Sequence, residues 1–284
     1  MSKAKFTFVG GDLRLGAAHE YIKSLGYASD TFLSEKDESV CKKDKCVSFP
    51  PSDIYVLPLP VTSDKVNINA PLSDLSLSFK DFFSMLPTSA VVFGGMIPEE
   101  VKSMSNDYSV PIYDYYTSEE LQIKNAVPTA EGAIEIALRE MPVTLYKTKS
   151  LVIGSGRISK VTAPLLSAFG SKVTVASRNP DSLLWNEIHG FDTINTALIS
   201  ESANKYDLII NTAPKKVLTG EILSLLKKDC LIIDLASRPG GVDMEEASRL
   251  GVKVIWALGL PGKCAPVSSG QIIGSTVLNM LKNI

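Results

Sequence analysis

Short apolar runs alternate along this chain with longer segments whose apolar residues recur at helical spacing. The clearest example is residues 150–180, SLVIGSGRISKVTAPLLSAFGSKVTVASRNP. An apolar run over 151–153 meets a glycine-containing turn, an apolar-periodic segment extends to Gly170, and a second β-rich run covers 173–176. This pattern predicts a strand, a glycine turn, a helix and a second strand, the unit that opens a dinucleotide-binding fold.

The same alternation continues on both sides of this unit. Before it, the pattern predicts strands and helices at 6–9, 15–25, 54–57, 81–86, 90–93, 98–103 and 111–113. After it, we expect strands at 192–194, 207–214, from 231 and from 252, and a final helix at 271–281. Strands that alternate with helices indicate a mostly parallel sheet. We therefore predict an α/β protein of two domains: a Rossmann-type doubly wound parallel sheet and a smaller flavodoxin- or Rossmann-like α/β domain.

The pattern also suggests where the domains begin and end. Residues 1–128 form the expected N-terminal substrate or catalytic domain, which the C-terminal helix 267–284 is expected to join. Pro128 resembles a residue that starts a helix, so a linking helix is predicted at 129–145. Residues 146–266 are then expected to form the Rossmann domain that binds the dinucleotide.

The composition limits the class of protein. Of the 284 residues, 45% are hydrophobic and 21% are charged, which is the ordinary balance of a globular protein. The net charge of −2 implies no broad basic surface, so nucleic acid is not an expected partner. No apolar run reaches the length of about 18 residues that a transmembrane helix needs, and the N-terminus carries no secretory signal. We therefore expect a cytoplasmic enzyme with no membrane partner.

The cysteines and histidines predict no metal site. Cys41 and Cys46 lie in a charged loop, at a spacing outside the commonest zinc pairing, and the only histidines, His19 and His189, are far from them in sequence. The four cysteines are expected to be free thiols in a reducing compartment.

The turn after residues 151–153 carries the first candidate cofactor contacts. A glycine at the first position permits the tight turn, a glycine at the second lets the backbone approach a pyrophosphate, and the helix N-terminus supplies free N–H groups. The third motif position is a small serine, which keeps helix and strand close. A turn that binds no ligand is the alternative. The predicted contacts are Gly154, Ser155, Gly156, Arg157 and Ile158.

The end of the second strand indicates which nucleotide is preferred. A site for NAD usually has Asp or Glu about 20 residues beyond the turn, to bond the ribose 2′-OH. This chain has Ser177, Arg178 and Asn179 there. A guanidinium and a hydroxyl suit a 2′-phosphate, so these residues favour NADP over NAD. The alternative is that Arg178 is a solvated loop residue.

Polar residues follow the later strands of this half as well. Asn211, Thr212 and Ala213 end one strand, and Arg238 follows another in a Ser-Arg-Pro-Gly-Gly turn. Such strand ends line the nicotinamide side of the crevice in this topology, so the first three are predicted cofactor contacts. Arg238 is the candidate clamp for a substrate carboxylate, against the alternative of a structural arginine that ties two loops together.

The N-terminal half offers two further candidates for substrate positioning. Arg14 lies near the carboxyl end of the first strand, and Glu131 lies in the first turn of the predicted linking helix. Each has a structural alternative, a helix-start arginine and an acid that complements the helix dipole. The candidate catalytic residues are therefore Arg14, Arg238 and Glu131, and the general base stays open among His19, Glu131 and Lys263.

The Gly-Gly turn at residues 10–11 resembles the central glycine turn in outline. Asp12 follows it, where a phosphate would be repelled. We therefore expect this half to be a substrate domain rather than a second nucleotide site.

Six segments, in order, resemble the A subunit of dipicolinate synthase from spore-forming bacteria. They span nearly the whole chain, and DLASRPGG followed by GLPG is the most specific part. The segments are GGDLR (10–14), NAVPTAEG (125–132), IGSGRIS (153–159), INTAP (210–214), DLASRPGG (234–241) and GLPGKCAP (259–266). The chain departs from the family pattern at Ser159, where a third glycine is usual, and in the loop from Cys41 to Cys46.

The resemblance implies a reaction and a partner. It implies that the chain acts with a B subunit, similar to flavoprotein-type decarboxylases, to oxidise 2,3-dihydrodipicolinate to dipicolinate while NADP⁺ is reduced. It also implies a small dicarboxylate substrate and a place in the mother cell during sporulation. A homo-oligomer is expected. The substrate is a planar dianion, so arginine clamps are expected, with Arg14 and Arg238 supplied by different domains.

Two other functions remain open from the sequence. The chain could be a non-catalytic protein that binds the cofactor while the chemistry occurs elsewhere. It could also be another NADP-dependent two-domain dehydrogenase, of the 2-hydroxyacid or shikimate type. The hydroxyacid version would want a histidine near the carboxyl end, and neither histidine lies beyond Glu221.

Overall fold

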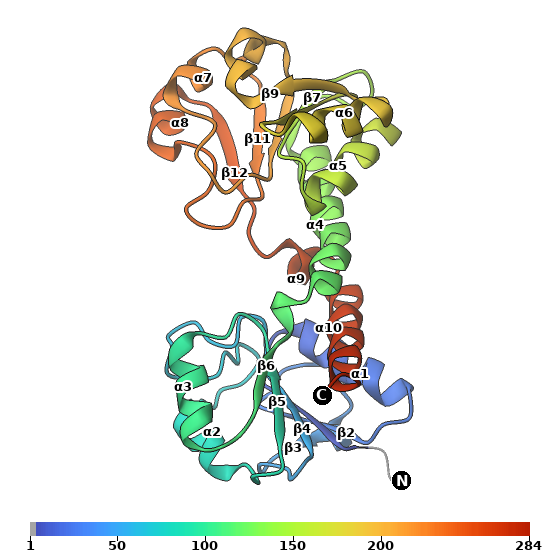
Figure 1. Ribbon diagram of the computed structural model, residues 1–284, viewed down its shortest axis with the longest axis vertical. Helices are drawn as coiled ribbons and strands as arrows, with labels where there is room; N and C mark the ends of the chain where they lie inside the picture. Colours follow the sequence, from blue (N-terminus) through green and yellow to red (C-terminus); the bar gives the residue numbers. More distant parts are fainter. Residues whose placement is uncertain (1–3) are drawn as a thin grey trace. The chain divides into compact units, whose positions relative to one another are not determined.

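The computed structural model describes residues 4–284 and divides into two compact units (Figure 1). The first unit contains the residues up to Asn125 together with Ala265–Ile284, and the second contains Ala126–Cys264. Each unit has a parallel sheet of its own, and each is described separately below.

In the described residues of the first unit, six strands form one sheet in the order β3-β2-β1-β4-β5-β6, and all pairs are parallel. This is the Rossmann order, in which the chain builds outward from β1 in both directions. The strands are β1 (Phe6–Val9), β2 (Ser29–Phe32), β3 (Lys45–Cys46), β4 (Ile54–Val56), β5 (Val91–Gly94) and β6 (Ile112–Asp114). The helices are α1 (Leu13–Ser24), α2 (Phe79–Met85), α3 (Glu99–Asp107) and α10 (Pro266–Leu281), with short 3₁₀ turns η1 (Lys42–Asp44) and η2 (Tyr115–Thr117).

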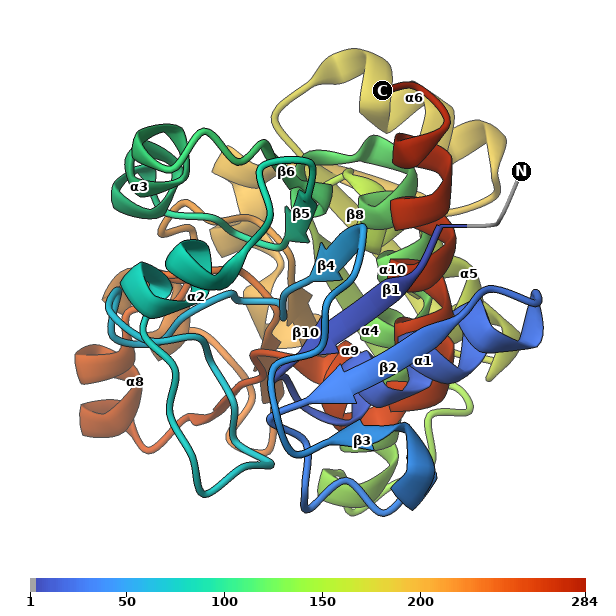
Figure 2. The same ribbon diagram turned by 90° about the horizontal axis from the view of Figure 1, so that it is seen from below.

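The C-terminal helix belongs to the first unit because it packs closely on α1 (Figure 2). Two glycines of α10 allow the close approach. A Cβ at Gly270 would lie 2.3 Å from the backbone oxygen of Arg14, and a Cβ at Gly274 would lie 2.8 Å from the ring of Tyr21. Larger residues at these positions would push the two helices apart.

The sheet of the second unit again has six strands over its described residues, in the order β12-β11-β10-β7-β8-β9 and all parallel. The strands are β7 (Lys149–Ile153), β8 (Lys172–Ser177), β9 (Asp192–Asn195), β10 (Leu208–Asn211), β11 (Leu231–Asp234) and β12 (Lys253–Trp256). The helices are α5 (Arg157–Ala168), α6 (Pro180–Ile188), α7 (Gly220–Ser224), α8 (Met244–Leu250) and α9 (Leu260–Cys264), with η3 (Thr196–Glu201) and η4 (Ala203–Lys205). The predicted doubly wound parallel fold is confirmed.

The central strands of this sheet explain the apolar runs in the sequence. All four residues of β10 and of β11 are buried. A parallel sheet with helices on both faces requires strands that are apolar on both sides, rather than alternating. Buried clusters therefore form on both faces, one including Val152 and Ile210, the other including Leu151 and Ile209.

The helix that joins the two units differs from the prediction. Helix α4 runs from Glu119 to Glu140, so it begins ten residues before 129 and ends before 145. Pro128 lies inside this helix instead of starting it. The prediction followed the preference of proline for a first turn, but the buried face continues through Pro128, from Leu121 to Ala133. Packing of that face overrides the local preference.

Two other details of the first unit also differ from the sequence-based expectation. Its sheet equals that of the second unit in strand number over the described residues, so it is not the smaller one. Strands β2 and β3 lie in segments that the apolar pattern did not indicate, because their sequences, SDTF and KC, are short and polar.

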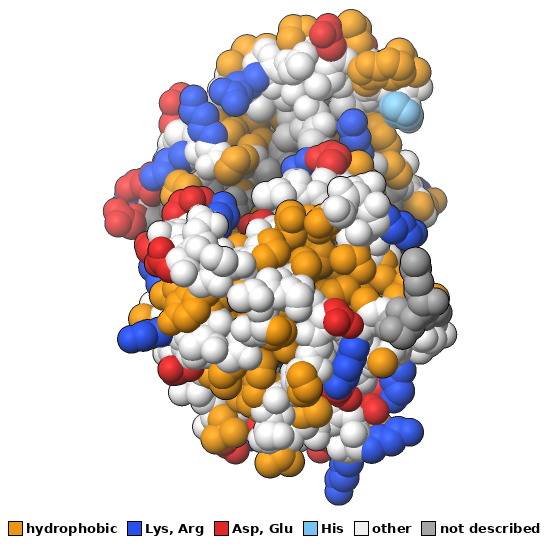
Figure 3. Space-filling view, turned by 60° about the horizontal axis from the view of Figure 1, so that its bottom comes forward, with side chains coloured by type: hydrophobic (Ala, Val, Ile, Leu, Met, Phe, Trp, Pro, Cys, Tyr) orange, Lys and Arg blue, Asp and Glu red, His pale blue; other side chains and the backbone are white. Residues whose placement is uncertain are grey.

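The surface carries mixed charge, in keeping with the small net charge. Figure 3 shows basic and acidic side chains interspersed on the face that it displays. None of the helices within residues 4–284 combines the length and the apolar character that crossing a bilayer requires.

Candidate functional site

The glycine turn of the second unit lies where a doubly wound sheet binds its ligand. The strand order reverses between β7 and β10, and the turn follows β7 at this switch point. Gly154 has φ +108°, and a Cβ there would lie 2.3 Å from Thr212 Oγ1. Thr212 in turn donates from its N–H and its hydroxyl to the carbonyl of Ile153 at 2.8 and 2.9 Å. Gly154 is therefore required by the protein's own packing.

Gly156 differs from Gly154, because the described structure does not itself require a glycine at this position. It is the N-cap of α5, with an ordinary φ of −84°, and a Cβ there would meet no described atom within 4 Å. Neither backbone strain nor packing explains the missing side chain. As the N-cap residue, this glycine brings no side chain that could cap α5. The end of the helix is thus open in the place where a pyrophosphate would need close access to backbone N–H groups.

The corresponding turn of the first unit is closed. Asp12 caps α1, and its carboxylate accepts a 3.0 Å hydrogen bond from the N–H of Arg14. The N–H of Gly11 donates to the carbonyl of Asn69 at 2.8 Å, and a Cβ at Gly10 would lie 2.9 Å from the same oxygen. A carboxylate and a loop of the chain itself therefore occupy the space and the donors that an anion would use.

At the end of β8, one cationic side chain is free to contact a ligand. Ser177 is buried, its hydroxyl lies 3.1 Å from that of Ser155, and it accepts from the N–H of Asn179. The Asn179 side chain caps α6 by accepting from Asp181 N–H at 2.9 Å. Arg178 between them is exposed, and it makes no hydrogen bond or ion pair with the residues that the structure describes.

A buried carboxylate organises the strand ends on the other side of the switch point. Asp234 is 1% exposed and accepts from Asn211 Nδ2 at 2.7 Å and from the N–H of Ala236 at 3.0 Å with one oxygen. Its other oxygen accepts from the N–H of Gly241 at 2.8 Å. Both ends of the 235–241 loop are thereby fixed to β11.

This network changes the role of one predicted cofactor contact. The Asn211 side chain is fully buried and also bonds Ala213 through both its amide and its oxygen. These hydrogen bonds occupy the Asn211 side chain. Asn211 therefore does not contact a ligand itself but positions the loop that would. Asp234 was not among the predicted residues. The signal that could have found it is a carboxylate at the end of an apolar run; in the structure it ends β11 and pairs in register with Asn211 on β10.

The arginines singled out by the sequence fall into two kinds. Arg14 is 14% exposed in its side chain and is paired with Asp12 through Nε and Nη2, at 2.8–3.1 Å, and it also donates to the carbonyl of Leu59. Arg238 is exposed, and among residues 4–284 it has no hydrogen-bond or ion-pair partner. Arg238 is therefore ready to accept an anionic ligand, whereas Arg14 would have to exchange one carboxylate for another.

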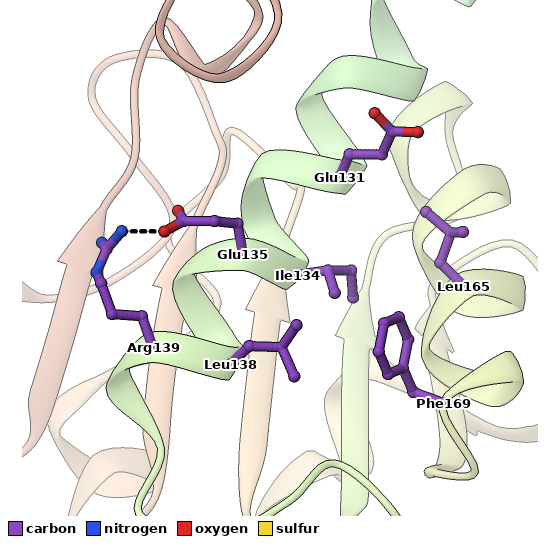
Figure 4. Close-up of a pocket in the computed structure, with 7 residues that line it drawn as sticks. All are labelled: Glu131, Ile134, Glu135, Leu138, Arg139, Leu165 and Phe169. Carbon is purple, nitrogen blue, oxygen red and sulfur yellow. Dashed lines mark hydrogen bonds and ion pairs between the residues drawn. The ribbon is translucent and has the colours of Figure 1, made fainter.

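Glu131 lies at an open groove. This groove, of about 640 Å³, runs between α4 and α5 (Figure 4). Apolar side chains from the two helices point toward each other, and Glu135 forms an ion pair with Arg139 along its edge. The lining residues are Glu131, Ile134, Glu135, Leu138, Arg139, Leu165 and Phe169.

His19 and Cys264 are held by structural contacts, whereas Lys263 is exposed and has no side-chain partner among residues 4–284. His19 is fully buried in the first unit, and burial, opposed by Glu20 and Asp44, lowers the pKa of its imidazole. Cys264 donates to the carbonyl of Pro128 at 3.0 Å, and burial raises the pKa of its thiol. His19 lacks the exposure of a reactive base, and the exposed Cys264 thiol is protonated at neutral pH, so it is not a reactive nucleophile.

The sheet order and the open glycine turn define a class: two-domain proteins built from two Rossmann-type units. A transhydrogenase from Sinorhizobium meliloti shares this fold, with a TM-score of 0.75 and 18% identity over 98% of this chain and 94% of that one.

Within this class, the chain is similar to the A subunit of dipicolinate synthase. Residues 5–116 match the family described as the N-terminal domain of that A subunit. The dipicolinate synthase A subunit of Bacillus subtilis is 28% identical, over 99% of this chain and 96% of that protein.

The solved structures agree with that similarity. The A chain of dipicolinate synthase from Bacillus subtilis superposes with a TM-score of 0.87 and 26% identity, over 100% of this chain and 97% of that one. The A subunit from Bacillus halodurans superposes with a TM-score of 0.89 and 24% identity, over 99% of both chains. The resemblance predicted from the sequence motifs is confirmed.

Proposed function

We propose that this chain is the nucleotide-binding oxidoreductase component of a dipicolinate synthase. In this proposal it oxidises 2,3-dihydrodipicolinate to dipicolinate with NADP⁺, together with a B subunit, in the cytoplasm of the mother cell of a sporulating bacterium. The similarity along the whole chain to a protein with that name supports the substrate class and the partner. A homo-oligomer remains part of the proposal.

The observation that carries the nucleotide part of the proposal is the open end of α5. Neither strain nor packing requires a glycine at Gly156, and as the N-cap residue it brings no capping side chain to the helix. A pyrophosphate seated there would accept hydrogen bonds from the backbone and gain from the positive end of the helix dipole. The contrast with the Asp12-capped helix of the first unit supports one nucleotide site rather than two.

The choice of NADP over NAD rests on Arg178. Its guanidinium is exposed and unpaired among the described residues, at the end of the second strand, where the ribose of a bound nucleotide lies in this topology. A 2′-phosphate would give it a charge-assisted, two-point partner. The residues present therefore fit NADP.

The substrate part of the proposal rests on Arg238. A planar dicarboxylate needs fixed cations, and the Asp234 network holds the loop that presents Arg238. Arg14 is the second proposed clamp, which would exchange the carboxylate of Asp12 for that of the substrate. Glu131 is retained as a proposed positioning residue only.

The chemistry asks the protein mainly to bind and orient. Oxidation of the dihydropyridine ring removes one hydride and one proton and leaves the aromatic ring. The bound nicotinamide supplies the acceptor for the hydride. The arginines would hold the two carboxylates so that the reacting ring carbon keeps one orientation. This positioning would lower the barrier to hydride transfer.

The test is a reconstitution with purified components. This chain by itself, a B subunit by itself and the two together are supplied with the dihydropyridine precursor and NADP⁺, and both NADPH and the pyridine dicarboxylate are followed by absorbance. We expect product with stoichiometric NADPH only when this chain is present.

The same assay separates the alternatives. Product formed at full rate by the B subunit without this chain would support a non-catalytic partner and contradict the proposal. A chain that reduces NADP⁺ with 2-hydroxyacids or shikimate but not with the dihydropyridine would support a different dehydrogenase.

A further inference from the structure

A compact polar cluster lies in the first unit, between α1 and the segment that leads into the edge strand of the sheet. His19 and Glu20 come from α1, and Asp44 comes from η1, which precedes β3. One ligand atom of each lies within 4.8 Å of the others. His19 Nε2 is 3.5 Å from Glu20 Oε1 and 3.8 Å from Asp44 Oδ2.

The imidazole of His19 is held with one nitrogen aimed into this cluster. Its side chain is fully buried, its ring lies edge-on to Phe8 with centroids 5.9 Å apart, and Nδ1 is hydrogen-bonded to Ser29 Oγ at 2.8 Å. Nε2 has no hydrogen-bond partner among the described residues. A buried polar atom without a partner is costly, and here it faces two carboxylate oxygens that do not satisfy it.

The arrangement has the spacing of a metal site. For a tetrahedral zinc ion with bonds of about 2.0–2.2 Å to nitrogen and oxygen, neighbouring ligand atoms are about 3.3–3.6 Å apart. The two separations measured from Nε2 are close to these values. A ligating histidine usually has its second ring nitrogen held by an outer partner, which is the part that Ser29 plays here.

The type of ligand selects the metal. Imidazole suits zinc and the later transition metals, whereas Mg²⁺ and Ca²⁺ prefer oxygen alone. We propose that His19, Glu20 and Asp44 form a site for one divalent transition-metal ion, Zn²⁺, with a solvent molecule in the fourth position. The Glu20 side chain is 43% exposed, so the ion has a path from solvent.

Lys23 is the cation that this site uses when no metal is bound. Its ammonium group forms an ion pair with the same oxygen of Asp44 that lies near Nε2. The Lys23 side chain is 34% exposed, so it can turn into solvent when a doubly charged ion takes its place. Metal and lysine therefore compete for one carboxylate oxygen.

The site would join α1 to the short segment that leads into the edge strand β3. It requires neither the glycine turn nor Arg178 and Arg238, so it is independent of the proposed nucleotide site. The sequence predicted no metal here because Asp44 is far from His19 along the chain, and only the pairing of β2 with β3 brings them together.

The experiment is a titration of the metal-stripped full chain with Zn²⁺ by calorimetry, with Co²⁺ as a visible spectroscopic probe. We expect one ion per chain and an increase in the thermal midpoint when the ion is added. Glu20→Gln and Asp44→Asn should each weaken binding at least about tenfold, a loss that even an outer partner of a metal ligand commonly causes. Glu20 is at the surface, so the first variant tests the site without disturbing the core.

The substitution Lys23→Ala gives a result in the opposite direction. Removal of the competing cation should tighten Zn²⁺ binding several-fold, whereas a purely structural Lys23–Asp44 ion pair predicts no such gain. His189→Ala and the double change of Cys41 and Cys46 to serine are matched controls for binding at other metal-binding side chains, and they should leave the affinity unchanged.

Three outcomes would overturn the proposal: no saturable binding of Zn²⁺, affinity that survives both Glu20→Gln and Asp44→Asn, or binding that is lost when the two cysteines are replaced. The reconstitution assay of the proposed function is unaffected by each of them, so the two proposals fail separately.

Discussion

Asn211 and Asp234 stand opposite each other at the carboxyl ends of β10 and β11, and the amide of the first donates a 2.7 Å hydrogen bond to the carboxylate of the second. The remaining oxygen of Asp234 takes the N–H of Gly241, at the far end of the loop that carries Arg238. The buried Asn211–Asp234 pair thus determines where the loop presents the exposed guanidinium group of Arg238.

This relationship predicts the effect of Asp234→Ala. The change removes the acceptor of one hydrogen of the Asn211 amide and of the N–H groups of Ala236 and Gly241. Unsatisfied buried groups cost about 1–3 kcal/mol each, so we expect the free energy of unfolding to fall by about 3 kcal/mol or more. Urea denaturation measures this, and Asp229→Ala, at an exposed site with no partner among the described residues, is the matched control. Equal stability of the two variants would contradict the role assigned to Asp234.

The two glycines of the nucleotide turn should separate stability from binding. Gly154→Ala places a Cβ 2.3 Å from Thr212 Oγ1 at a positive φ, so the protein should be destabilised, by about 1–3 kcal/mol for a strained backbone position. Gly156→Ala meets no described atom, so stability should change by less than about 1 kcal/mol. The second variant should nevertheless lose NADPH affinity, measured by fluorescence titration. Undiminished affinity in Gly156→Ala would remove the main support for a pyrophosphate at α5.

Arg178 should discriminate between the two nicotinamide nucleotides. We expect Arg178→Ala to weaken NADPH binding about tenfold or more, the equivalent of one charge-assisted hydrogen-bonded contact, and to leave NADH binding nearly unchanged. Parallel titrations with the two nucleotides measure the ratio of affinities. Arg249→Ala, which removes an exposed arginine paired with Glu246, controls for the loss of positive charge. Equal losses for both nucleotides would end the case for a 2′-phosphate contact.

Much of the second unit could be predicted from its sequence because one local pattern carries the information. The apolar runs, the glycine turn and the following periodic segment all lie within about 30 residues, so their geometry follows from the chain itself. The opposite holds for Asp234. What this carboxylate does depends on partners that the fold brings to it, Asn211 from β10 and Gly241 from the far end of the loop.

The errors have a common physical cause. Pro128 was expected at a helix start because local preference was the only signal in the sequence, whereas the buried face of α4 continues through it. The polar segments of β2 and β3 become strands only because β1 and β2 provide edges on which to pair. In both cases tertiary contacts decide, and their energies exceed the differences in intrinsic preference.

Cys230 should make stability fall in alkaline solution. The side chain is 1% exposed, and burial raises the pKa of its thiol to about 12. In the unfolded chain the thiol of a cysteine titrates at about pH 8.5. Between about pH 8.5 and about pH 12 the folded protein therefore keeps a thiol proton that the unfolded chain has released. The free energy of unfolding declines as the pH rises through this range. From about pH 8 to about pH 10, we expect this group to remove about 1–2 kcal/mol. Urea denaturation of the wild type and of Cys230→Ala measures the difference in slope, with Cys41→Ala at an exposed thiol as the matched control. Parallel pH profiles for the wild type and Cys230→Ala would show that the buried thiol is not the cause.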